Sequence, residues 1–260
     1  MGWLGVIALA ALILLLIPIF VLLYYGLGPL RDSAGYSILV FRSIELSLVA
    51  SALAVAVDVV VFTPLAYYLA RGSDRIAESL VDIPISVPHP IIGVALLILD
   101  SPITPTGKIL LGLHIDFYNT ILGLVLALVI MSAPIFVKSM QPYFESRESS
   151  TEEFAAGLGA SRIRTLFAVV LPESFDGLTS ASLVSMSRAL SEFGSISIIA
   201  YYVLQYPFYG VSPASVTIYN FFSGNTAGGL NAAVTASAAM ILVAIPIALA
   251  GHFVRRRPRR

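Results

Sequence analysis

Charged and hydroxyl side chains recur close to residue 190, inside an otherwise apolar stretch. Arg188 and Glu192 are four residues apart, so in a helix they lie on one face, and Ser185 and Ser195 extend that polar stripe. A guanidinium group and hydroxyl groups can donate hydrogen bonds to a tetrahedral oxyanion. We therefore predict that these four residues line a water-filled translocation path. The alternative is an ion pair that only fixes this helix to its neighbours.

A second polar group falls in the proline-rich stretch IPISVPHP at residues 83–90. Pro84, Pro88 and Pro90 cannot sustain a regular helix. A broken backbone at membrane depth needs protein or water around it, so we expect this stretch to face a cavity or a subunit interface. His89 is thereby a fifth candidate for the path, and the alternative is a hydrogen-bonded interfacial histidine. Asp58, in another apolar stretch, is expected to be a buried hydrogen-bonded group, and the alternative is a proton relay.

The remaining reactive residue types exclude several functions. The chain has no cysteine, and His89, His114 and His252 show no metal-ligand spacing, so we predict no metal site. The loop G-x-x-x-x-G-K-[ST], which binds nucleotide phosphates, is absent, and so is the protease signature H-E-x-x-H. We therefore expect neither catalytic residues nor a cofactor in this chain. A net charge of zero gives no reason to expect a nucleic-acid partner.

The elements that must position these residues are apolar helices. Of the 260 residues, 58% are hydrophobic and 12% are charged, which is about half the charged fraction of a soluble domain. Apolar runs near 20 residues long recur along the chain, and that length crosses a bilayer. We predict an all-α integral membrane protein, contacting lipid, with one transmembrane domain over residues 1–260. The six expected spans are Trp3–Tyr25, Ile44–Ala70, Ile83–Leu99, Thr120–Val137, Leu178–Leu204 and Gly228–Val254.

The basic residues predict how these spans are oriented. The first apolar run has no basic residue before it and is long enough to span, so we interpret it as an uncleaved helix and not a signal peptide. Placing the N-terminus in the cytoplasm puts eleven of the fifteen Lys and Arg on the cytoplasmic side and only Arg31, Arg42 and Lys108 outside. Both termini are therefore expected in the cytoplasm of a multi-pass plasma-membrane protein.

One segment, TEEFAAGLGASRIRTLFAVVLPES at residues 151–174, is too charged for the bilayer. Ser150 and Glu153 have the spacing of a helix capping box. Gly159 can take the left-handed conformation that ends a helix, and Ser161 can cap a second helix. Pro172 suits the first turn of the helix that follows. The segment is thus predicted to be a rigid helix–turn–helix on the cytoplasmic face.

This segment resembles the EAA loop of the permeases of type I ABC importers. The matching pattern is Glu153-x-Ala155-x3-Gly159-x9-Val169-x-Leu171-Pro172, with Phe154 where the family usually has alanine. The resemblance implies that residues 138–177 form a cytoplasmic coupling loop that docks on an ATP-binding subunit. The coupling residues it implies are Glu153, Ala155, Ala156, Gly159, Ala160, Ser161, Leu171 and Pro172.

Three further blocks are similar to the molybdate/tungstate and sulfate branch of these permeases: TPLAYYLAR from Thr63, VDIPISVPHPIIGVALL from Val81 and SRALSEFGSISIIAYY from Ser187. The resemblance implies three kinds of partner: a second copy of this chain, a dimer of ATP-binding subunits that hold ATP and Mg, and an extracytoplasmic oxyanion-binding protein. The implied function is ATP-driven import of tungstate or molybdate by alternating access. A sulfate/thiosulfate permease and an ion-coupled secondary transporter are the alternatives, although the inverted repeats typical of secondary transporters are not seen.

Overall fold

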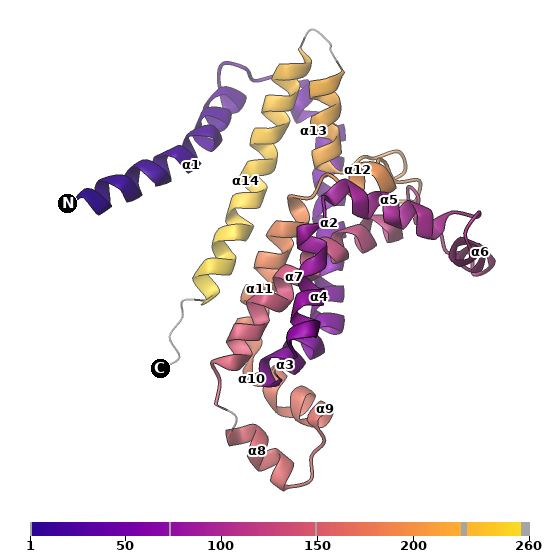
Figure 1. The fold of residues 1–260 in the computed structure, drawn as a ribbon. Coiled ribbons are helices and arrows are strands. Elements are labelled where there is room, and N and C mark those ends of the chain that lie inside the picture. The colour runs from indigo at the N-terminus through magenta and orange to yellow at the C-terminus, as the bar shows by residue number, and fades with distance from the viewer. Residues whose placement is uncertain (1, 73, 149, 225–227, 256–260) are drawn as a thin grey trace.

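The computed structural model describes residues 2–72, 74–148, 150–224 and 228–255. These residues form an elongated helical bundle (Figure 1), in which the only β contact is an isolated antiparallel bridge between Val203 and Val211. The helices are α1 (Trp3–Leu27), η1 (Ala34–Tyr36), α2 (Ile38–Val57), η2 (Asp58–Phe62), α3 (Thr63–Arg71), α4 (Arg75–Ser86), α5 (His89–Asp100), α6 (Pro105–Gly112), α7 (Ile121–Glu145), α8 (Ser150–Gly157), α9 (Arg162–Thr165), η3 (Leu166–Val170), α10 (Leu171–Glu173), α11 (Phe175–Leu190), α12 (Ile196–Ile199), α13 (Ala214–Ser223) and α14 (Gly229–Arg255). The predicted all-α fold is confirmed.

Four of the predicted spans are long apolar helices. They correspond to α1, to the continuous run α2–η2–α3, to α7 and to α14. The second of these runs from Ile38 to Arg71 over 34 residues. A π-helical turn at Asp58–Phe62 interrupts its α-helical hydrogen bonding, but the helix continues through it. The tail at residues 256–260, which contributes to the orientation argument, lies outside the described residues.

The proline-rich third span is bent, as its sequence predicts. Helices α4 and α5 meet at an angle of 100° across the break at Val87 and Pro88. After the bend, α5 lies crosswise to the long helices (Figure 1) and packs against α12 and α7. His89 is its first residue.

The fifth predicted span is wrong as a single helix. Helix α11 ends at Leu190 after 16 residues, which is about 24 Å and shorter than a bilayer core. The backbone N–H of Ser195 donates a hydrogen bond to Oε1 of Glu192 at 2.9 Å, so the Glu192 side chain replaces a helical partner there. The described residues contain four long spans, or five with the bent pair, and the count of six stays a prediction.

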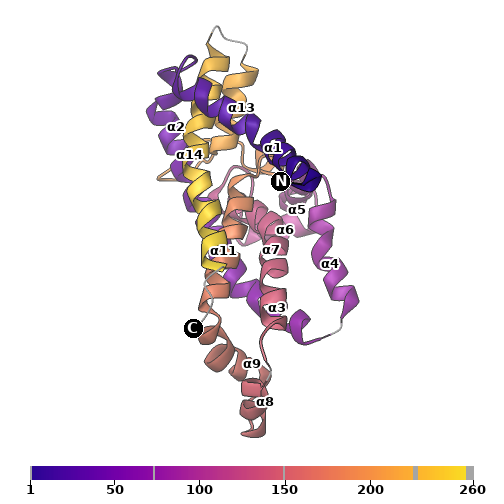
Figure 2. The same cartoon turned by 90° about the vertical axis from the view of Figure 1, so that its left-hand side faces the viewer.

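Helix α7 is the centre of the bundle. Its buried residues include Leu128, Met131, Phe136 and Met140, and they pack against α2, α3 and α11. Helix α1 lies on the outside with its apolar side chains exposed, and it contacts α14 near Gly26. Helices α8 and α9 project beyond the bundle at the end opposite η1 and α13, and both views show this (Figures 1 and 2).

Candidate functional site

The turn between α8 and α9 has the predicted left-handed glycine. Gly159 has φ +82°, its N–H donates to the carbonyl of Ala156 at 2.9 Å, and the N–H of Ala160 donates to that of Ala155 at 3.0 Å. This pair of bonds is a Schellman motif, which ends α8 sharply. A Cβ atom at Gly159 would meet no atom within 4 Å, so the backbone conformation alone, and not crowding, favours glycine here.

The second half of this element also follows its sequence. The Ser161 hydroxyl accepts a hydrogen bond from the N–H of Arg164 at 3.3 Å and so caps α9. Pro172 lies in the first turn of α10, as predicted. Helix α8 includes Ser150 as its first residue, so the capping position is residue 149, which lies outside the described residues. We call residues 150–165 the α8–α9 element.

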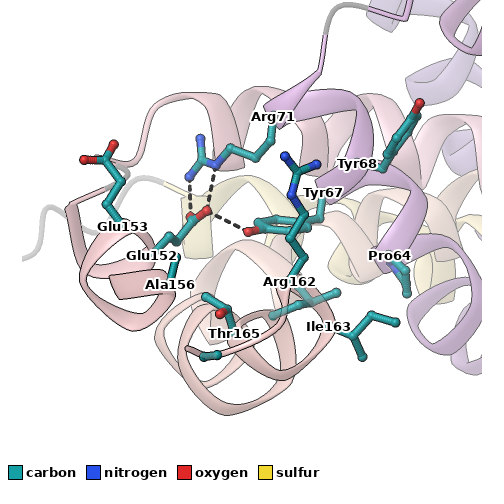
Figure 3. A pocket seen from close by; sticks show the side chains of 12 residues that line it. Pro64, Tyr67, Tyr68, Arg71, Glu152, Glu153, Ala156, Arg162, Ile163 and Thr165 are labelled. Atoms are coloured by element: carbon teal, nitrogen blue, oxygen red, sulfur yellow. Dashed lines mark hydrogen bonds and ion pairs between the residues drawn. The ribbon is translucent and has the colours of Figure 1, made fainter. Parts of the chain in front are cut away.

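Arg71 fastens the α8–α9 element to the bundle. Arg71, the last residue of α3, contacts Glu152 of α8 with Nη2 to Oε1 at 2.6 Å and Nε to Oε2 at 3.1 Å. The Tyr67 hydroxyl donates to the same Oε2 at 2.7 Å, and Nη1 of Arg71 donates to the carbonyl of Phe144 at 2.8 Å. Figure 3 shows this bidentate arrangement. Burial alone would raise the pKa of Glu152, but the hydrogen bonds from Arg71 and Tyr67 outweigh it and lower that pKa.

Sequence reasoning missed this anchor. Arg71 and Tyr67 belong to a block noted only for its resemblance, and Glu152 stands beside the residue that the family pattern emphasises, Glu153. Eighty-one residues separate Arg71 from Glu152 along the chain, so no local spacing could have paired them. The one sequence signal for this anchor was the position of a charged residue, Arg71, at the end of an apolar run.

The α8–α9 element and the turn after it expose large apolar side chains. Phe154 is 71% exposed, Leu158 75%, Ile163 72% and Phe167 57%. The implied coupling residues Glu153, Ala156, Gly159, Ser161 and Pro172 are exposed as well, whereas Ala155, Ala160 and Leu171 are half-buried. The element is therefore held to the bundle by Arg71 and also exposes a set of large apolar side chains.

Four of the five predicted path residues form one cluster where α5 begins and α11 ends. Oε2 of Glu192 lies 3.0 Å from Nδ1 of His89 and 3.2 Å from Nη2 of Arg188. Oε1 of Glu192 accepts the hydroxyl of Ser195 at 3.0 Å. The Glu192 side chain is fully buried, whereas those of Arg188 and His89 are 22% and 38% exposed. A buried carboxylate thus holds two partly exposed nitrogen donors.

Close backbone packing builds this cluster. A Cβ atom at Gly194 would lie 2.8 Å from Cβ of His89, and one at Gly93 would lie 2.5 Å from the carbonyl oxygen of Ser195. Both glycines are therefore required for α5 to approach the segment before α12. Nη2 of Arg188 also reaches Nε2 of His89 at 2.9 Å, so the three charged or polar groups contact one another in pairs.

Ser185 does not join this cluster. Its hydroxyl donates to Oδ2 of Asp58 at 2.6 Å, and the hydroxyl of Ser132 donates to the same atom at 2.6 Å. All three side chains are buried, and they connect η2, α7 and α11. The expectation that Asp58 is a buried hydrogen-bonded group is confirmed.

Together these features define an all-helical, multi-pass membrane protein with a helix–turn–helix element that projects at one end (Figure 1). The chain belongs to the family of binding-protein-dependent transport system inner membrane components, whose model matches residues 63–260. It is therefore a membrane permease component of a transport system, located in the plasma membrane.

Individual relatives agree with this family. The molybdate/tungstate transport system permease protein of Pyrococcus furiosus is 32% identical over 249 residues, which cover 95% of this chain and 89% of the relative. A sulfate transport system permease protein of Synechocystis sp. is 30% identical over 126 residues, covering 48% of this chain and 44% of that one. The solved inward-facing MetNI methionine ABC transporter superimposes with a TM-score of 0.61 at 18% identity, covering 85% of this chain and 97% of the compared chain, and it shows the shared fold.

Proposed function

We propose that this chain is the permease subunit of an ABC importer for a tetrahedral oxyanion, molybdate or tungstate. The support for the substrate is the relative from Pyrococcus furiosus, whose similarity extends over nearly the whole chain. Sulfate is the second candidate because a sulfate permease is also related, over about half of the chain. These anions share charge and shape, so their selection is assigned to an external binding protein.

The observation that carries the proposal is the apolar surface of the α8–α9 element. Phe154, Leu158 and Ile163 stand exposed on a segment whose charges keep it out of the bilayer, and an exposed apolar patch of this kind marks a protein-interaction site. The chain has no phosphate-binding loop of its own. We therefore assign this surface to a cytoplasmic ATP-binding subunit, which supplies ATP and Mg.

The anchor explains how movement of that subunit would reach the membrane. Arg71 is the last residue of the 34-residue run from Ile38, and it binds Glu152 of α8 directly. Displacement of the α8–α9 element is thereby applied to the end of a long helix that packs on α7. We propose that closure of two ATP-binding subunits moves two such elements together and opens the permease pair to the outside.

The cluster around Glu192 is proposed as part of the substrate path. Arg188 offers N–H donors that an oxyanion can use, and Glu192 holds its guanidinium in place. His89, whose Nε2 accepts from Arg188 while its Nδ1 faces Glu192, helps to position that guanidinium. Ser195 and Ser185 are fully buried, so their contribution would be to position Glu192 and Asp58. A second copy of this chain would enclose the path from the other side.

Reconstitution tests this function. The chain would be placed in liposomes with its ATP-binding subunit and its binding protein, and uptake of tungstate, molybdate and sulfate would be measured with and without ATP. We expect uptake only with ATP, and native mass spectrometry is expected to give two copies of this chain and two of the ATP-binding subunit. Uptake driven by an ion gradient without ATP would identify a secondary transporter instead.

A further inference from the structure

A pocket lies between the end of α3 and the α8–α9 element. Its volume is about 350 Å³, and its wall combines aromatic, apolar and charged side chains. Tyr67, Tyr68 and Pro64 come from α3, whereas Arg162 and Ile163 come from the start of α9. The pocket opens on the surface that also exposes Ile163. It is therefore part of the surface assigned above to the ATP-binding subunit.

The two arginines of this pocket differ in how they are paired. Arg71 is neutralised by Glu152, whose two oxygens are occupied by Arg71 and Tyr67. Arg162 is exposed, and within the described part of the chain its guanidinium has no ion-pair or hydrogen-bond partner. Figure 3 shows the Arg162 side chain extending toward Tyr67 and Arg71. Glu153 also lines the pocket, but it has a partner of its own.

The surroundings of Arg162 favour a partner carboxylate. The rings of Tyr67 and Tyr68 and the side chains of Pro64 and Ile163 exclude water on several sides once the mouth is covered. An ion pair formed there would be screened less than one on an open surface. Arginine beside aromatic rings is also the composition typical of the energetic centre of a protein interface.

We propose that Arg162 binds the carboxylate of an aspartate or glutamate from the ATP-binding subunit, and that this acidic side chain enters the pocket. The inference rests on the proposed function, because it names the chemistry of the partner at the same surface. A free oxyanion fits less well, since the only cation of the pocket without a carboxylate partner, among the described residues, is Arg162. The mouth is also continuous with exposed apolar side chains that a small anion would leave uncovered.

The chain offers a matched control for the test. Arg164 is on the same short helix, is exposed, and has no side-chain partner within the described residues, but it does not line the pocket. Affinity of the ATP-binding subunit would be measured by biolayer interferometry on the full chain in nanodiscs. We expect Arg162→Glu to weaken binding at least about 30-fold and Arg162→Gln to weaken it less, because only glutamate adds repulsion. Arg164→Glu should change binding less than about threefold.

Charge-swap rescue identifies the partner residue. Acidic residues on the ATP-binding subunit would be changed to arginine one at a time, and one of them is expected to restore binding to Arg162→Glu but not to improve wild type. Equal binding by Arg162→Glu and Arg164→Glu would overturn the inference while leaving the proposed function intact. Tungstate binding to the isolated wild-type chain that Arg162→Gln abolishes would overturn it in favour of a small-anion site. Absence of binding even by wild type would defeat the proposed function itself.

Discussion

Arg71 and Glu152 join the end of a membrane-spanning helix to the projecting α8–α9 element, with Nη2 and Oε1 2.6 Å apart. Both side chains are mostly buried, and both oxygens of the carboxylate are used. A bidentate pair of this kind is directional, so it sets the orientation of α8 as well as its distance from α3. The proposed transmission of movement therefore depends on this contact.

Breaking the pair should loosen the α8–α9 element without unfolding the bundle. We expect Arg71→Met, Glu152→Gln and the double variant to give a coupling free energy of about 1–3 kcal/mol, since hydrogen bonds to charged groups lie in this range. The measurement is amide hydrogen exchange of residues 150–165. Arg164→Met is the control and should leave exchange unchanged, whereas equal exchange in all variants would show that the pair does not hold the element.

The same contact predicts a response to acid. Hydrogen bonds from Arg71 and Tyr67 lower the pKa of Glu152 below its ordinary value of 4.5. The stabilisation of the folded element is therefore fully present above that ordinary value and is lost as the pH falls through the lowered pKa. Hydrogen exchange of α8, corrected for its intrinsic pH dependence, should rise only in that acidic range. Glu152→Gln should abolish this pH dependence, and an unchanged profile in that variant would contradict the assignment.

Gly159→Val should disturb the turn between α8 and α9. The φ of +82° is unfavourable for a β-branched residue by about 1–2 kcal/mol, although the site has room for a side chain. We expect weaker binding of the ATP-binding subunit with the spans still inserted. Gly157→Ala is the control, because it lies in helix α8 with open space around it and should be neutral or slightly stabilising. Wild-type binding and ATPase stimulation by Gly159→Val would refute the prediction.

Arg188→Ala should lower transport more than assembly. The change removes partly exposed N–H donors. We expect oxyanion uptake to fall about tenfold or more, because the free energy of one charge-assisted hydrogen bond corresponds to a factor of that size. The scaffold interpretation predicts instead that removing one partner strands the buried charge of Glu192, at a cost of about 3–5 kcal/mol. The double variant Arg188→Met with Glu192→Leu separates the two. Recovery of both assembly and transport in that variant would show that the pair is structural.

Thiol labelling tests whether the cluster lines the path. The native chain has no cysteine, so single cysteines give a clean readout. Ser191, which is exposed and accepts a hydrogen bond from Arg188, should react when changed to cysteine, whereas Ser195→Cys should stay protected because Ser195 is fully buried. Reactivity at position 191 should change when an ATP analogue is trapped. Identical labelling in every nucleotide state would remove this segment from the path.

The sequence by itself determined the features that depend on neighbours along the chain. Hydropathy over about 20 residues predicted α1, α7 and α14, and prolines predicted the break before His89, because lipid and backbone geometry impose these limits whatever the fold around them. Gly159 and Ser161 predicted the turn, since every hydrogen bond in it spans five residues or fewer. The class of protein and its helical content followed from these local constraints.

Tertiary structure decided what distant residues do together. The anchor between Arg71 and Glu152, and the contact of Asp58 with Ser132 and Ser185, join residues 74 to 127 positions apart, so their partners depend on how helices pack. The end of α11 was also missed from sequence, because the side chain of Glu192 turns back to the N–H of Ser195. Helix α5 packs closely against this turn because Gly194 has no Cβ atom to meet His89. Hydropathy carries no information about such a contact.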